Sequence, residues 1–139
     1  MQKSTLLLFL FLLPTLTTTA QLRLARLFTD HTVLQRQKPI PVWGWANPNE
    51  QVTVSLANQR QQAKADNSGK WQVKFAAMEA GGPHTLTAET ISGRLTFSDI
   101  LIGDVWLCSG QSNMEWTVAE SANYLQEKKN ANFPKIRHF

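Results

Sequence analysis

The stretch Trp71-Gln72-Val73-Lys74-Phe75 decides the fold, because every second side chain in it is apolar and the side chains between are polar. Such alternation buries one face of a β-strand and leaves the other face in water. The same pattern recurs upstream in Val52-Thr53-Val54-Ser55-Leu56 and downstream in residues 85–89. The pattern therefore predicts half-buried strands rather than amphipathic helices.

Turn signals separate these strands at short intervals. They are Asn47-Pro48-Asn49-Glu50, Asn58-Gln59, Asp66-Asn67-Ser68-Gly69, Ala80-Gly81-Gly82-Pro83 and Ser92-Gly93. Several short strands with turns at this spacing predict an antiparallel β-sandwich over residues 21–98.

Three of the five tryptophans fall on these strands, namely Trp43, Trp45 and Trp71. Their place in an alternating pattern predicts that most of them belong to the core. The alternative is that they are exposed and stack on sugar rings. In that case the sandwich would be a non-catalytic glycan-binding or interaction module, and this alternative stays open.

Near Asp99 the pattern changes from alternating to continuous. Ile100-Leu101-Ile102 and Val105-Trp106-Leu107-Cys108 are apolar runs, which suit strands buried on both faces of a parallel sheet. Residues 118–130 contain no Pro or Gly and carry apolar residues at helical spacing, and residues 136–139 suggest another strand. This order predicts the first βαβ unit of an α/β domain over residues 99–139.

The N-terminus has the pattern of a secretory signal peptide over residues 1–20. Lys3 precedes an apolar run at 6–13, and Thr18-Thr19-Ala20 supplies small residues before Gln21. The run is well short of the ~20 apolar residues that span a bilayer. We therefore expect an exported protein, periplasmic or secreted, that begins at Gln21 and has no membrane attachment after cleavage.

Composition excludes some functions. The net charge is +4, but the basic residues are scattered rather than clustered on one element, so we expect no nucleic-acid partner. Cys108 is the single cysteine and cannot form an internal disulfide. Its apolar neighbours predict a small buried hydrophobe rather than a reactive thiol.

Ser112 is the candidate for chemistry. It lies between an expected buried strand and an expected helix, where a side chain is held firmly and backbone N–H groups can face a developing negative charge. Gly110, two residues earlier, permits a close turn. A serine in this place can also simply cap the helix, and position alone leaves both interpretations open.

A family resemblance favours the catalytic interpretation. Gly110-Gln111-Ser112-Asn113-Met114-Glu115 resembles the first signature block of the sialate O-acetylesterase family of carbohydrate esterases, within the SGNH hydrolase group. Residues 103–109, 27–36 and 41–46 resemble the same family. The resemblance implies a β-sandwich leader domain, then a flavodoxin-like catalytic domain. It also implies hydrolysis of O-acetyl esters on sialic acids or other sugars, with no metal or cofactor.

Carried onto this sequence, the resemblance makes Ser112 the nucleophile and its backbone N–H one donor of the oxyanion hole. In the family the other donors and the Asp and His of the triad come from later blocks. His31, His84 and His138 do not match the family's catalytic His, and we expect them to be ordinary surface or strand residues. Since a serine hydroxyl needs a base, we expect this chain to be an N-terminal portion, truncated before its base and inactive as it stands.

Overall fold

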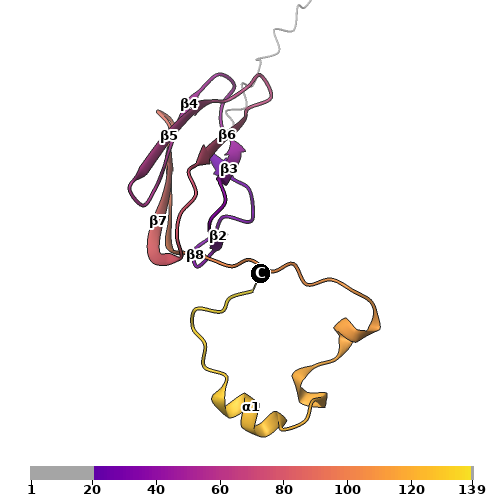
Figure 1. Ribbon diagram of the computed structural model, residues 1–139. Helices are drawn as coiled ribbons and strands as arrows, with labels where there is room; N and C mark the ends of the chain where they lie inside the picture. The colour runs from indigo at the N-terminus through magenta and orange to yellow at the C-terminus, as the bar shows by residue number, and fades with distance from the viewer. Residues whose placement is uncertain (1–20, 139) are drawn as a thin grey trace, which may run out of the picture.

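The computed structural model describes residues 21–138, so the expected signal peptide at 1–20 and Phe139 lie outside the described residues. The described part is mostly β-structure followed by a long irregular segment with short helices (Figure 1). The strands are β1 (Arg23–Leu24), β2 (Val33–Gln35), β3 (Ile40–Trp45), β4 (Gln51–Leu56), β5 (Gln59–Lys64), β6 (Lys70–Phe75), β7 (Gly81–Glu89) and β8 (Arg94–Gly103).

These strands form two sheets. The first has the order β1-β3-β6 and is antiparallel throughout. The second has the order β2-β8-β7-β4-β5, in which β2 pairs parallel with β8 and the other neighbours are antiparallel. At its far edge β5 exposes a polar row that includes Arg60, Gln61 and Lys64.

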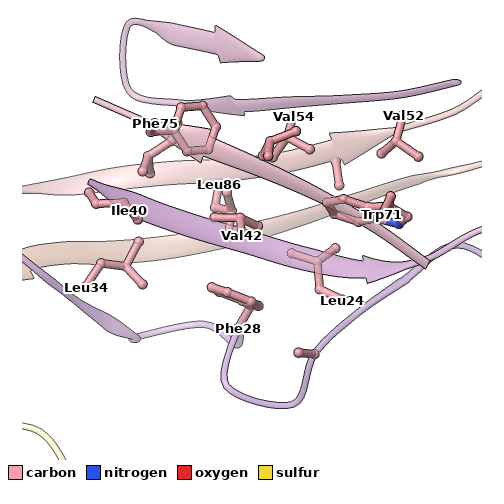
Figure 2. Packing of buried hydrophobic residues seen from close by; sticks show 14 of the residues in the cluster. Leu24, Phe28, Leu34, Ile40, Val42, Val52, Val54, Trp71, Phe75 and Leu86 are labelled. Atoms are coloured by element: carbon pink, nitrogen blue, oxygen red, sulfur yellow. The ribbon is translucent and has the colours of Figure 1, made fainter. Parts of the chain in front are cut away.

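The alternation predicted for residues 71–75 is confirmed in β6, where Trp71, Val73 and Phe75 are buried and the residues between them are exposed. In β4, Val52 and Val54 are fully buried. The buried side chains of both sheets make one cluster (Figure 2). Each such side chain contributes about 1.5–3 kcal/mol by leaving water, so this shared core holds the two sheets together.

A tight turn joins β5 to β6. The Asp66 carboxylate accepts hydrogen bonds from the backbone N–H groups of Ser68 (2.7 Å) and Lys70 (3.0 Å). Gly69 has a φ of 78°, and a Cβ there would lie 2.5 Å from the Ala46 carbonyl oxygen. Only glycine fits this position without displacing the neighbouring backbone.

The tryptophans divide differently from the prediction. Trp71 lies in the core, but Trp43 and Trp45 are half-buried on the opposite face of β3. The reason is that β3 directs Val42 and Gly44 inward, so its aromatic side chains point outward. A Cβ on Gly44 would lie only 2.8 Å from Cζ2 of Trp71, which shows that the indole fills the space beside this glycine.

The apolar run at 100–102 does not form a separate strand buried on both faces. It is the last part of β8, where Ile100 and Ile102 are buried and Leu101 is half-buried. β8 lies between β7 and β2 and continues across residues 98 and 99 to Gly103.

The βαβ unit expected after Asp99 is wrong for the described residues, since 104–138 contain no strand. The run at 105–108 is exposed, with Trp106 at 84% and Leu107 at 95% of full exposure, and Cys108 is exposed rather than buried. Strands of a parallel sheet need neighbours for their backbone groups and helices for their faces, and the described residues supply neither.

In place of one helix over 118–130, the segment has two short 3₁₀ helices and one α-helix. They are η1 (Ser112–Glu115), η2 (Val118–Glu120) and α1 (Tyr124–Asn130). η2 begins with a capping box in which the Thr117 N–H donates to the Glu120 carboxylate at 2.9 Å. Over residues 21–138, none of the helices has the length and apolar character that crossing a membrane requires.

Candidate active site around Ser112

Ser112 is the first residue of η1 and is exposed to solvent. It lies in the segment 104–138, which leaves the end of β8, passes away from the sheets and returns to them near the C-terminus (Figure 1). The segment buries no side chain fully, and only Tyr124 and Arg137 in it are half-buried. The serine is therefore held by local turns rather than by a packed strand.

Local contacts shape the turn that presents the serine. The Met114 N–H donates to the Gln111 carbonyl at 2.9 Å. A Cβ on Gly110 would lie 3.0 Å from Cγ of Met114, so glycine lets the Met114 side chain fold back over the turn. The residue before the helix, Gln111, makes no side-chain capping bond. The first N–H groups of a helix have no acceptor within it, so the Ser112 N–H is available to a ligand.

Within the described part of the chain, the structure brings no base to Ser112. Across residues 21–138, no hydrogen bond joins the Ser112 hydroxyl to an imidazole or a carboxylate. His84 lies in β7 and His138 on the returning chain. His31 lies in the loop between β1 and β2, where its Nδ1 is 2.6 Å from Oδ2 of Asp99.

Sequence reasoning missed the cluster that His31 belongs to. Arg137 approaches the same loop, and its guanidinium donates to the His31 carbonyl (2.9 Å), the Asp99 carbonyl (2.6 Å) and the Asp99 carboxylate (2.8 Å). The hydrogen bonds from His31 and then Arg137 lower the pKa of Asp99 below its usual value. His31 and Asp99 both have positive φ, at 68° and 54°. No sequence signal reports this contact, because the three residues lie far apart in the chain.

A second polar cluster lies where the chain leaves β8. Arg36 Nε donates to the Asp104 carboxylate at 2.9 Å, and the Val105 N–H donates to the Gln35 side-chain oxygen at 3.0 Å. The hydrogen bond from Arg36 lowers the pKa of Asp104. The bonds from Gln35 and Arg36 to Asp104 and Val105 fix the direction in which segment 104–138 leaves β8.

The outward-facing tryptophans border a separate pocket of about 570 Å³. Trp43 packs edge-on against Phe28, with ring centroids 5.0 Å apart, and the Arg23 guanidinium lies 4.0 Å from the ring centroid of Trp45. In residues 21–138, no three His, Cys, Asp or Glu side chains gather as a metal site. The pocket is lined by Trp43, Trp45 and Trp71 together with Lys64, Asp66 and Gln72.

Comparisons with known proteins give the class. No family model matches the chain. A solved carbohydrate acetylesterase from Xanthomonas citri superposes with a TM-score of 0.77 at 43% sequence identity, covering 82% of this chain and 26% of that one. The chain thus has the fold of part of a carbohydrate acetylesterase.

Curated relatives give the family more closely. The mouse sialate O-acetylesterase is 33% identical over 84% of this chain, and the Pongo abelii and human sialate O-acetylesterases are 36% and 35% identical over 78%. The resemblance to the sialate O-acetylesterase family is therefore confirmed. The chain spans about a quarter of the length of these curated relatives.

Proposed function

We propose that this chain carries the nucleophile of a sialate O-acetylesterase-like enzyme that hydrolyses O-acetyl esters on sialic acids or other sugars. The observation that carries the proposal is the similarity to acetylesterases over about four fifths of the chain, in a sequence that contains Gly110–Glu115. Ser112 is the nucleophile, and its backbone N–H is one donor to the oxyanion.

The chemistry assigns a task to each group. The Ser112 hydroxyl adds to the acetyl carbonyl while a base takes its proton, and the tetrahedral oxyanion is stabilised by N–H donors. The sugar then leaves as an alcohol, and water releases acetate from the acetyl-serine. Because no imidazole or carboxylate among residues 21–138 is hydrogen-bonded to Ser112, we propose that the 139-residue chain alone does not turn over.

We further propose how the chain is organised. The boundary expected after residue 98 falls inside β8, which runs to Gly103. Residues 21–103 would therefore be a β-sandwich leader domain, and the chain from 104 would begin a flavodoxin-like SGNH catalytic domain. The two sheets with one shared core support the first part. Residues 1–20 would be an export signal, so that the protein acts in the periplasm or outside the cell, without metal or cofactor.

A chimaera tests the role of Ser112. The aligned quarter of the Xanthomonas citri acetylesterase is replaced by residues 21–138 of this chain, and hydrolysis of p-nitrophenyl acetate and of an acetylated sugar is measured. The chimaera should be active, and Ser112→Ala should lower its rate by several orders of magnitude, as loss of a catalytic serine does elsewhere. Ser109→Ala is the matched control. An active Ser112→Ala chimaera would exclude Ser112 as the nucleophile.

A second candidate function is glycan binding at the outer face of the three-stranded sheet. The pocket beside Trp43 and Trp45 favours it, because aromatic rings beside Lys64 and Asp66 combine a stacking surface with hydrogen-bonding groups. Titration of the 139-residue chain with acetylated oligosaccharides tests this function by tryptophan fluorescence. Binding should be lost in Trp45→Ala and kept in Trp116→Ala, and the absence of any saturable change would exclude it.

A further inference from the structure

The segment 27–36, which lies between β1 and the end of β2, contacts both ends of the segment 104–138. At the outgoing end, Arg36 binds Asp104 and Gln35 binds the Val105 N–H. The Arg36 N–H also donates to the Gly103 carbonyl at 2.9 Å. Three hydrogen bonds to Gln35 and Arg36 therefore hold the chain at the point where it leaves β8.

At the returning end, Arg137 binds one group of the same stretch, the His31 carbonyl, and two groups of Asp99 in β8. The guanidinium reaches the His31 carbonyl and, through both its amino groups, the carbonyl and carboxylate of Asp99. Its side chain keeps only 19% of full exposure, in a segment that is otherwise almost wholly exposed. A planar guanidinium with several fixed donors suits such a group of acceptors, and an ammonium group matches it less well.

The segment 27–36 is itself firmly built. The Asp30 carboxylate accepts from the N–H (2.6 Å) and hydroxyl (2.8 Å) of Ser98 on β8. The buried Thr32 hydroxyl accepts from the Thr29 N–H at 3.1 Å, and β2 pairs with β8 in register from Val33. The polar residues of segment 27–36 thus join the sheet to segment 104–138. This structural role explains the family-like stretch 27–36, which takes no part in the proposed chemistry at Ser112.

We propose that segment 27–36, together with Asp99 of β8, is a clamp that holds both ends of segment 104–138, and that Arg137 is the positioning residue that fixes the returning end. Holding both ends of a loop restricts the positions that the residues between them can reach. The clamp thereby limits where Ser112 can lie relative to the sheets. The importance of that position for catalysis rests on the proposed function, but the clamp itself does not.

Spin labels test the clamp without any need for activity. One nitroxide is placed on the native Cys108, four residues before Ser112, and the other on Gln61→Cys in the exposed edge strand β5 of the 139-residue chain. The parent protein should give a narrow distance distribution. Arg137→Gln should abolish the narrow peak, and Arg137→Lys should restore part of it. Lys129→Gln, which removes an equal charge from α1, should leave it intact.

The outgoing end provides a second test that holds even if Arg137→Gln unfolds the sheets. Arg36→Asp and Asp104→Arg should each broaden the distribution, and the two together should narrow it again, because the ion pair is re-formed with its charges exchanged. Far-UV circular dichroism checks that the sheets persist. A parent distribution that is already broad, or a narrow one that survives both Arg137→Gln and Arg36→Asp, would overturn the clamp.

Discussion

Gly44→Ala tests how closely the sheet is packed. Gly44 lies in β3 opposite Leu24 of β1. An added Cβ would lie 2.1 Å from the Arg23 carbonyl oxygen and 2.8 Å from Cζ2 of Trp71. Both distances are far below van der Waals contact, and the first neighbour is backbone, which cannot turn aside. The methyl group therefore must separate β1 from β3 or displace the Trp71 indole.

Overpacking of this kind costs about 1–3 kcal/mol, and more where backbone must move. We expect the free energy of unfolding to fall by at least that amount, with an unchanged dependence on denaturant concentration. Urea unfolding followed by tryptophan fluorescence measures it. The 139-residue chain and its variant are compared under the same conditions.

Gly93→Ala is the matched control, because no atom lies within 4 Å of its added Cβ. This substitution should change the free energy of unfolding by no more than about 0.5 kcal/mol, as most surface substitutions do. If Gly44→Ala were as stable as Gly93→Ala, the close approach of β1, β3 and Trp71 would be refuted.

Three further results are expected. Hydrogen bonds from Ser68 and Lys70 lower the pKa of Asp66 below 3.8 in the folded chain, so its stabilising effect is present above that pH and is lost as the pH falls through the folded value. In urea unfolding at neutral pH, Asp66→Asn should therefore have a lower free energy of unfolding than the parent. This difference should vanish in acid, and a difference that does not change with pH would contradict the prediction. Brief chymotrypsin treatment should cut first after Trp106 or Leu107 and leave the two sheets intact, whereas an early cut within 40–75 would count against a separate sheet domain. Mass spectrometry of the exported protein should find Gln21 as the first residue, and an intact Met1 in the cytoplasm would exclude a cleaved signal.

The sheets were the most predictable part of the molecule. In β4 and β6 one face is apolar and the other polar, so alternation identified both the strands and their buried residues. β3 carries Val42 on one face and Trp43 on the other, so apolar character did not show which face was buried. Gly44 is the residue that distinguishes the two faces of β3, because the inward face has a glycine where the Trp71 indole needs room.

The surroundings of Ser112 were the least predictable. The apolar run at 105–108 predicted a buried strand, but burial needs neighbours that residues 21–138 do not provide. The bonds from His31 and Arg137 to Asp99 could not be predicted either. They join residues 68 and 38 positions apart, and they depend on left-handed backbone at His31 and Asp99, which no residue pattern announces.

The polar edge strand β5 has a consequence for the behaviour of the protein in solution. An unpaired strand edge offers its N–H and C=O groups to any extended chain, and flat apolar edges promote aggregation in this way. β5 presents Arg60, Gln61 and Lys64 there. A second molecule adding to this edge would bring basic side chains against basic side chains. Because charged side chains on an edge strand disfavour the addition of another strand, we expect β5 to be a poor template for edge-to-edge association.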